Sequence, residues 1–300
     1  TSSIYSTGAF FLVLVVSMSF FVWRGAIGSQ SRSSDLFIIY GGTCAFVDGL
    51  NPYNSDDVDK SIKIRNFKKD LPERDIISLY PPSTYFLMSP MALFDWSTAR
   101  AFWLLIQLAS VAVIIVGLLA WSDTKINVKF TCALVLLTVL CFAPVQTGIR
   151  LGQLALPVMA LVVIGNLFTI QGKFILAIFC FAIGVSLKPQ LALGLACVPL
   201  LIGRGKITLL SGSLCLVLLG QSLIILSING YGLDSTDSWL EGLKENIKIF
   251  SNSGDGSVGK SNLKRHELLN LSYPISLLTG GMPIDKWLGF LEVKAVGGWS

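Results

Sequence analysis

Few side chains in this 300-residue chain combine a chemically active group with an informative position. The first is Asp35, which stands near the start of the segment SDLFIIYGGTCAFVDGLNPY, residues 34–53. Two cations, Arg150 and Lys188, stand between apolar runs, and His266 is the single histidine. A carboxylate can accept a proton, and a cation can bind an anion. What each group can do depends on the elements that hold it.

The segment with Asp35 at its head is too polar to span a bilayer and too apolar for a plain linker. Its apolar residues recur at steps of three and four, which predicts one face of a helix: Leu36, Phe37, Tyr40, Cys44 and Val47. Ser33 or Ser34 can cap its start, and Gly49 stands where a helix ending at Asp48 would stop. We expect this helix to lie in the membrane interface with its apolar face on lipid. On spacing alone, Asp35 would then complement the helix dipole.

Composition predicts a membrane protein. Hydrophobic residues make up 53% of the chain, charged residues 14%, and the mean hydropathy is +0.68. A bilayer-spanning helix needs about 20 mostly apolar residues. Runs of this kind occur at 7–23, 101–121, 129–145, 154–170, 173–187, 189–203 and 207–228. We therefore expect a polytopic α-helical protein, and we take it for a fragment of a longer chain, so that these spans are a minimum.

The basic residues between the runs predict an orientation. Five of them lie in alternate short connections: Lys125, Lys129, Lys173, Arg204 and Lys206. The intervening connections carry only Arg150 and Lys188. By the positive-inside rule the richer set is cytoplasmic, so Arg150 and Lys188 face the exterior. The single membrane domain would then carry two large outer loops, 24–97 and 229–270.

One apolar stretch in the first outer loop, residues 80–94 (YPPSTYFLMSPMALF), is too short for a crossing, and Pro90 would break it. We interpret it as a juxtamembrane or re-entrant helix on the outer face, which is tolerated where protein surrounds it. Asp48 is expected to be structural, because it lies near a helix end. Three further acids of this loop are expected to form a solvated, mobile strip: Asp56, Asp57 and Asp59.

Composition also argues against several kinds of site and partner. Five of the six cysteines lie in apolar runs, where they behave as small hydrophobic residues, so no disulfide framework is expected. No cluster of cysteine or histidine suggests a metal site and no cofactor is implied, although the sequence leaves the role of a divalent metal open. The net charge of +5 fits basic cytoplasmic loops and requires no nucleic-acid partner. No internal repeat of the kind found in secondary transporters is apparent.

Four blocks, in their order along residues 35–190, resemble glycosyltransferase family 87. They are Asp35 to Tyr40 (DLFIIY), Gly49 to Tyr53 (GLNPY), Tyr80 to Pro82 with Pro90 and Trp103, and Gly152-Gln153 followed by Lys188-Pro189. The family consists of membrane enzymes of the C-type superfamily that use polyprenyl-phosphate sugars, typically mannose. Each block alone is common, but their order, spacing and shared outer location make the combination specific. Ala155 stands where the family typically has Asn.

The resemblance implies an all-α integral membrane protein. Its fold would be a polytopic helical bundle of the C-type glycosyltransferase kind, with amphipathic juxtamembrane helices in the large first outer loop. It also implies that an acidic residue of that loop, here Asp35, takes the proton from the acceptor hydroxyl. The hydroxyl then displaces lipid phosphate from the anomeric carbon with inversion. Because phosphate is a good leaving group, one general base suffices.

The leaving phosphate also needs cationic neighbours. Arg150 and Lys188 flank matched blocks and are the candidates, and their alternative role is snorkelling to the interface. His266 is a further candidate for a phosphate or acceptor contact, with an ordinary loop role as the alternative. Gln153 would hydrogen-bond a sugar or cap the next helix. Tyr80, which lies in a matched block, completes the candidate donor-binding residues.

These inferences predict a glycosyltransferase of cell-envelope glycolipid biosynthesis. It would move a sugar, mannose by resemblance, from a polyprenyl-phosphate donor to a lipid or glycan acceptor. The protein would be a multi-pass protein of the plasma (inner) membrane with its site on the outer face. A transporter or flippase of lipid-linked intermediates is one alternative, but it predicts charges within the membrane runs, which are essentially absent. A non-catalytic membrane subunit is the other, and it predicts no dependence on Asp35.

Overall fold

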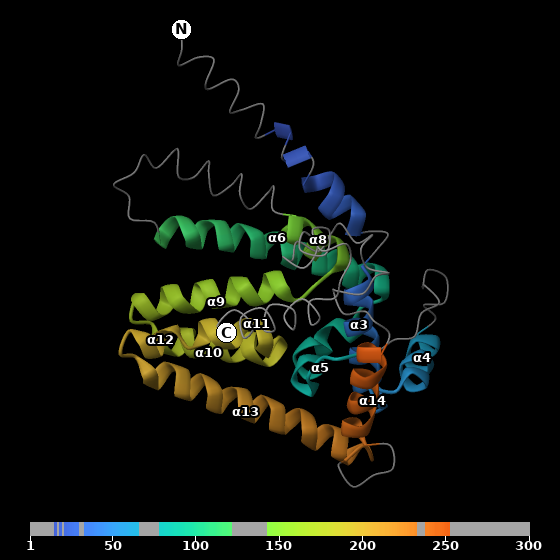
Figure 1. Cartoon of the computed structure of the whole chain (residues 1–300). Coiled ribbons are helices and arrows are strands. Elements are labelled where there is room, and N and C mark those ends of the chain that lie inside the picture. The colour runs from blue at the N-terminus through green and yellow to red at the C-terminus, as the bar shows by residue number, and fades with distance from the viewer. Residues whose placement is uncertain are drawn as a thin grey trace, which may run out of the picture. The chain divides into compact units, whose positions relative to one another are not determined.

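The protein is described here from a computed structural model that covers residues 15–16, 18–19, 21–29, 33–65, 78–121, 143–232 and 238–252. Among these residues the regular elements are helices, without a strand (Figure 1). This confirms the prediction of an all-α protein. The chain forms two compact units, Thr1–Leu243 and Lys244–Ser300, and the packing discussed below lies within the first.

The helices of the described part follow in this order. They are η1 (Val22–Ile27), α3 (Ser34–Val47), α4 (Ser55–Ile64), α5 (Pro82–Met88), η2 (Ser89–Leu93), α6 (Trp96–Trp121), α8 (Ala143–Leu151), α9 (Ala155–Ile170), α10 (Phe174–Leu187), α11 (Pro189–Ala196), α12 (Val198–Leu201), α13 (Gly205–Ile228) and α14 (Trp239–Asn252). η1 is a π-helix and η2 a 3₁₀-helix. The boundary between the two compact units falls within α14.

Two described helices are long and apolar enough to cross a membrane, Trp96–Ala120 in α6 and Gly205–Ile228 in α13. A third crossing is possible if α8 and α9, which meet at a bend of 118°, form one broken span. The expected runs 173–187 and 189–203 correspond to shorter apolar helices. The expected runs at 7–23 and 129–145 lie largely outside the described residues.

The long helices pack in the spatial order α6, α9, α10, α13 (Figure 1). Small residues allow close approach: a Cβ atom on Gly117 of α6 would lie 2.2 Å from Val163 of α9, and one on Gly165 would lie 2.9 Å from Phe181 of α10. α10 and α13 run in parallel. Their N-terminal ends meet where Arg204 lies over the ring of Phe174, at 5.3 Å, and further along Ser186 Oγ donates to Cys215 Sγ at 3.2 Å.

Helix α3 matches the predicted helix in length but not in surroundings. The apolar spacing predicts one face on lipid, whereas ten residues of α3 are buried within the protein, among them Ile39 and Tyr40. Phe37 packs edge-on against Trp96 at 5.5 Å, and the Tyr40 hydroxyl donates to the Phe94 carbonyl at 2.7 Å. The lipid-facing prediction is therefore wrong for α3, because α5, η2 and α4 cover it. A helix that is apolar all round is typical of a core position.

The two ends of α3 differ in how well the sequence predicts them. At the C-terminus, Gly49 adopts a φ of +73° beyond the last turn, as expected for a glycine that ends a helix. At the N-terminus, Ser33 occupies the cap position but makes no capping bond. Its hydroxyl donates instead to the Ser29 carbonyl. The predicted capping by Ser33 is therefore wrong, while the predicted end of the helix is confirmed.

The acidic strip of the first loop is a folded helix. Asn54 caps α4, because its side-chain oxygen accepts bonds from the backbone N–H groups of Asp56 and Asp57 at 2.9 and 3.2 Å. α4 is amphipathic, with Val58 and Ile62 buried against α3. Acidic residues in a first turn complement the helix dipole. The prediction of a mobile strip is therefore wrong, whereas the prediction that the acids are solvated is confirmed for Asp56 and Asp59, which are exposed.

The stretch 80–94 forms two short helices, as its proline predicts. α5 runs from Pro82 to Met88, and the chain continues from Ser89 as the 3₁₀-helix η2, with Pro90 in its first turn. Five residues of α5 are buried, so protein surrounds this element rather than lipid. α5 packs against α3, α10 and α13. It therefore links the first loop to the long helices.

Candidate active site

The predicted catalytic acid lies where α3 meets the turn between α8 and α9. Asp35 is in the first turn of α3 and is half-buried, and Ser34 Oγ donates to its Oδ1 atom at 3.2 Å. In the α8–α9 turn, Gly152 has a φ of +74°, and a Cβ atom there would lie 2.5 Å from the Cβ of Leu36. Only glycine fits this approach. The Gly152-Gln153 block therefore sits directly beside the residue that follows Asp35.

Two side chains from α6 hold that turn. Trp103 Nε1 donates to the Gly152 carbonyl and Gln107 Nε2 donates to the Gln153 carbonyl, both at 2.9 Å. Both donors are buried, and they lie four residues apart, on one face of α6. A turn held by buried hydrogen bonds has little freedom to move, since breaking one leaves a polar group unsatisfied. α6 thus fixes the loop that covers the start of α3.

The matched block Gly49 to Tyr53 is hydrogen-bonded to the matched block that begins at Tyr80. The hydroxyl of Tyr53 donates to the carbonyl of Tyr80 at 2.7 Å. Tyr53 itself is fixed by Asn51, whose side-chain oxygen accepts from the Tyr53 N–H at 3.0 Å, and Asn51 N–H donates to Asp57 Oδ2 at 3.0 Å. A series of hydrogen bonds that involve side chains therefore joins α4 to Tyr80. This places the Tyr-Pro-Pro segment next to α3.

The fourth block lies at a break between two helices. α10 ends at Leu187, α11 begins at Pro189, and Lys188 between them is extended, with φ −153° and ψ 82°. Ser83 Oγ of α5 donates to the Ser186 carbonyl at 2.8 Å, and Thr84 Oγ1 donates to the Leu187 carbonyl at 3.0 Å. α5 and the end of α10 are therefore joined immediately before Lys188.

Electrostatics connects three of these segments. Lys188 is half-buried, and burial lowers the pKa of its amine, while the nearby charge of Asp35 acts in the opposite direction. Burial raises the pKa of the Tyr80 hydroxyl, and the charge of Asp35 raises it further. The carboxylate of Asp35 thus lies close enough to interact with both groups. The charge of one carboxylate therefore acts on a cation and a phenol that come from two other segments of the chain.

The remaining candidates have different surroundings. Arg150, in the last turn of α8, is 8% exposed, and a Cβ atom on Gly28 would lie 3.1 Å from its Cγ and Cδ atoms. The N-cap of α9 is Leu154 rather than Gln153, which removes the helix-capping alternative for Gln153. His266 lies outside the described residues. Within the described part of the chain, no group of three His, Cys, Asp or Glu side chains could hold a metal ion.

The sequence model of glycosyltransferase family 87 matches residues 79–282, which is more than half of the chain. The chain belongs to glycosyltransferase family 87. It is therefore a membrane glycosyltransferase with a donor and an acceptor substrate. No curated protein and no solved structure matches the chain. Membership in this family favours the enzyme over the transporter and the non-catalytic subunit.

The matched span of the glycosyltransferase contains five of the six candidate residues and leaves one outside. Tyr80, Arg150, Gln153, Lys188 and His266 fall within it. Asp35 precedes the span. Its proposed catalytic role therefore rests on its position next to the Gly152-Gln153 turn and not on the family match.

Three residues of the candidate site were not identified from the sequence, namely Ser83, Thr84 and Gln107. Trp103 was named there, but only as part of a motif. Gln107 could have been recognised, because a buried glutamine in an apolar span, one turn from a motif tryptophan, needs a partner. Ser83 and Thr84 gave no such signal, since their partners lie more than 100 residues away.

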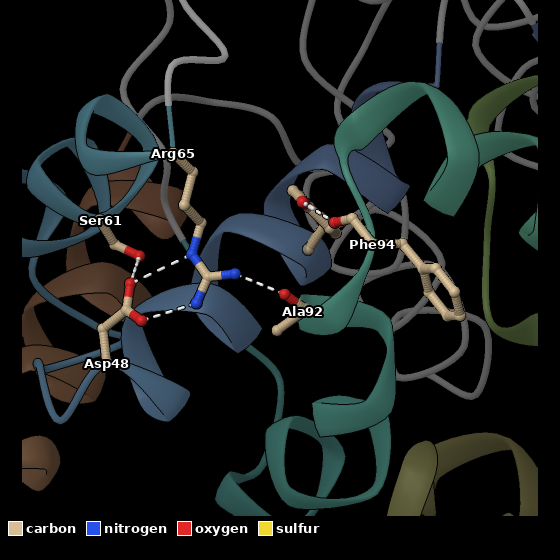
Figure 2. Close-up of polar contacts among 6 residues, drawn as sticks. Asp48, Ser61, Arg65, Ala92 and Phe94 are labelled. Atoms are coloured by element: carbon tan, nitrogen blue, oxygen red, sulfur yellow. Dashed lines mark hydrogen bonds and ion pairs between the residues drawn. The ribbon is translucent and has the colours of Figure 1, made fainter.

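The far end of α3 carries a charged cluster of a different kind (Figure 2). Asp48 accepts a bond from Ser61 Oγ at 2.5 Å and pairs with Arg65 at 2.6 Å, while Arg65 also donates to the Ala92 carbonyl. Burial acts to raise the pKa of Asp48, but the bonds from Arg65 and Ser61 and the Arg65 charge outweigh it, so its pKa lies below the ordinary value. The cluster ties α3, α4 and η2 together, consistent with the structural role expected of Asp48.

Proposed function

We propose that this glycosyltransferase moves mannose from a polyprenyl-phosphate donor to a hydroxyl of a lipid or glycan acceptor, with inversion at the anomeric carbon. One observation carries the proposal: Leu36, which follows Asp35, packs against Gly152, and the segment that contains Tyr80 is bonded to the end of α10 directly before Lys188. A carboxylate beside an amine supplies the two groups that this reaction needs. The identity of the sugar rests on the resemblance alone.

Asp35 is the general base in this proposal. Its carboxylate takes the proton of the acceptor hydroxyl as the hydroxyl oxygen forms a bond to the anomeric carbon. The bond between that carbon and the phosphate oxygen breaks, and the phosphate leaves with the electron pair. Asp35 is half-buried in the first turn of α3, next to the turn that carries Gly152. General-base catalysis of this kind contributes about 10²–10⁴-fold to a rate.

Lys188 and Arg150 stabilise the departing phosphate in this scheme. Lys188 stands between the end of α10 and the start of α11, and the charge of Asp35 acts on its amine. Arg150 is almost fully enclosed by protein, and its carbon chain lies against Gly28. A snorkelling side chain keeps its charged head in water. The enclosure of Arg150 therefore argues against snorkelling as its role.

The sugar and the acceptor would be bound by the neighbouring uncharged groups. Tyr80 offers a ring and a hydroxyl beside Asp35, and the Gln153 side chain belongs to the turn that covers α3. His266 remains a candidate for a phosphate or acceptor contact. The excess of basic residues in alternate connections supports a site on the outer face of the plasma (inner) membrane.

The direct test uses membranes that contain the full-length protein and labelled polyprenyl-phosphate mannose. We expect label to pass to a lipid or glycan product with release of polyprenyl phosphate, and Asp35→Asn to reduce both about 10²–10⁴-fold. Polyprenyl-phosphate glucose and a nucleotide-activated mannose serve as matched donors. Transfer from the nucleotide donor alone would contradict the proposed donor class, and equal use of glucose would contradict the proposed sugar.

A further inference from the structure

The break between α10 and α11 leaves backbone groups that need partners. In a continuous helix the Leu187 carbonyl would accept from the N–H of Leu191, but that N–H bonds to the Lys188 carbonyl at 3.1 Å. Pro189 has no N–H to offer to the turn before it. A buried carbonyl without a partner is unfavourable, particularly in a membrane protein, where broken helices persist only if other groups satisfy them. The end of α10 therefore depends on outside donors.

Two hydroxyls of α5 are those donors. Ser83 Oγ donates to the Ser186 carbonyl at 2.8 Å and Thr84 Oγ1 donates to the Leu187 carbonyl at 3.0 Å. Ser83 is 2% exposed, Thr84 is fully buried, and Ser186 is 1% exposed, so water does not compete for these bonds. We call Ser83, Thr84 and the two carbonyls that they bind the hydroxyl clamp.

The clamp acts on the residue that comes next in the chain. Lys188 follows Leu187 directly, and its extended backbone turns the chain from α10 into α11. Because Thr84 holds the Leu187 carbonyl, it also fixes the peptide group that joins Leu187 to Lys188. The same short segment carries Tyr80, which lies beside Asp35. One element thus sets the positions of two groups around the proposed base.

We propose that Ser83 and Thr84 are positioning residues, whose hydroxyls hold the α10–α11 break so that the amine of Lys188 meets the donor phosphate. This inference rests on the proposed function, in which Lys188 binds that phosphate. The two residues do not touch the substrate. Because a misplacement of about 1 Å can reduce a rate about 10²-fold, removing the clamp changes catalysis although the charge of Lys188 is retained.

The two side-chain replacements of Thr84 separate a hydroxyl effect from a packing effect. Thr84→Val keeps the shape and loses the hydroxyl, whereas Thr84→Ser keeps the hydroxyl and loses a methyl group. If the clamp positions Lys188, Val reduces kcat/KM for the lipid-linked donor about tenfold and Ser leaves it within about twofold. If Thr84 only fills space, Ser is the impaired variant and Val is active, which would overturn the proposal.

A double-mutant cycle tests whether the clamp acts through Lys188. We would measure kcat/KM for polyprenyl-phosphate mannose in membranes with Ser83→Ala and Thr84→Val, each alone and together, in the native and the Lys188→Ala backgrounds. Losses in the native background should largely disappear in the Lys188→Ala background. Equal losses in both backgrounds would overturn the proposal. Thr84→Val keeps the bond from Ser83, and Ser83→Ala keeps the bonds from Thr84 to the Ser186 and Leu187 carbonyls, at 3.4 and 3.0 Å. The single variants therefore test the idea even if the double variant fails to fold.

A second measurement does not depend on the reaction. In a Lys188→Cys protein, alkylation of residue 188 by a thiol reagent is followed by mass spectrometry, with and without Thr84→Val. Loss of the clamp should change the alkylation rate several-fold, and an unchanged rate would contradict the positioning role. An unimpaired Lys188→Ala enzyme would contradict the phosphate role. Unimpaired clamp variants beside an impaired Lys188→Ala enzyme would contradict the clamp alone.

Discussion

Helix α10 has a lysine at each end, and the two lysines have opposite surroundings. Lys173 occupies the N-cap, is exposed, and its Nζ lies 5.7 Å from the ring centre of Phe168. Lys188 occupies the C-cap, is half-buried, and lies near the carboxylate of Asp35. At the Lys173 end, α13 adds Arg204, which rests on the ring of Phe174. At the N-terminal end of α10, two cations lie on aromatic rings. At the C-terminal end, one cation is half-buried and interacts with the charge of an acid.

The difference separates two functions that composition alone does not distinguish. An exposed cation on an aromatic ring, within an apolar surface, is typical of a side chain that reaches for the membrane interface. A half-buried cation loses part of its hydration, and titratable groups that are perturbed by burial and by a neighbouring charge are enriched at functional sites. The environment of Lys173, exposed and next to an aromatic ring, is therefore typical of a snorkelling side chain. Lys188 is half-buried and does not share that environment. The following predictions test this distinction, from the largest expected effect to the smallest.

Asp35→Asn should produce the largest effect, because it removes the proton acceptor and the acid that distinguishes the Lys188 end. We expect transfer to fall about 10²–10⁴-fold, with expression and donor binding retained. Rates are measured with labelled polyprenyl-phosphate mannose in membranes. Asp59→Asn on α4 is the matched control, since Asp59 is exposed, and it should stay active. An active Asp35→Asn enzyme would remove the proposed mechanism.

Lys188→Ala and Arg150→Ala should each reduce donor efficiency, because a charge-assisted contact to phosphate is lost. A contact of about 1.5–3 kcal/mol corresponds to a loss of about ten- to hundredfold. Lys173→Ala, at the other end of α10, should change kcat/KM by less than about twofold, as exposed substitutions generally do. Equal effects of the Lys173 and Lys188 substitutions would show that the two ends do not differ in function.

The two lysines should also differ in their response to pH. Burial lowers the pKa of Lys188, although Asp35 opposes the change, so Lys188 loses its proton at a lower pH than an ordinary lysine. The donor KM should therefore rise several-fold between about pH 7 and 10. Lys188→Arg should flatten this rise, since arginine stays charged. Lys173→Arg should leave the profile unchanged, and a matching shift in that variant would contradict the assignment.

The smallest effect on transfer is expected at the other acid of α3. Asp48→Asn should destabilise the fold by about 1.5–3 kcal/mol, while the activity of the folded enzyme stays within about twofold. Because the pKa of Asp48 lies below its ordinary value in the folded protein, its stabilisation is complete above about pH 4 and is lost as the pH falls through the folded value.

Thermal unfolding of the detergent-solubilised protein across acidic pH measures this contribution. The difference in midpoint between the native protein and Asp48→Asn should be large at neutral pH and shrink under acid. Arg65→Gln, which breaks the same pair, is the matched variant. A difference that stays constant across the pH range would contradict the role of the Asp48 carboxylate.

The sequence predicts where a helix ends better than it predicts which other helices pack against it. Gly49 and Pro90 act locally, through backbone conformation and a missing N–H, and both predictions are confirmed. The burial of α3 depends on α5 and η2, which no local pattern contains, although the absence of a polar face in DLFIIYGGTCAFV was a hint.

The candidate site shows the same limit. The motif blocks nominate Asp35, Tyr80, Gly152 and Lys188 as neighbours, and the structure joins their segments. The residues that join them make side-chain bonds to backbone carbonyls, as Gln107 and Thr84 do. Such bonds leave little trace in a single sequence, because any carbonyl can accept them. Supporting residues were therefore the part that could not be predicted.

The hydroxyl clamp has a consequence for how the enzyme is made. Ser83 and Thr84 are separated from their carbonyl partners by more than 100 residues, and Gln107 by 46 from the Gln153 carbonyl. During synthesis, α3 and α5 leave the ribosome long before α10 exists. The surroundings of Asp35 can therefore be completed only after residue 188 has emerged, so a nascent chain released earlier would contain the acid but no working site.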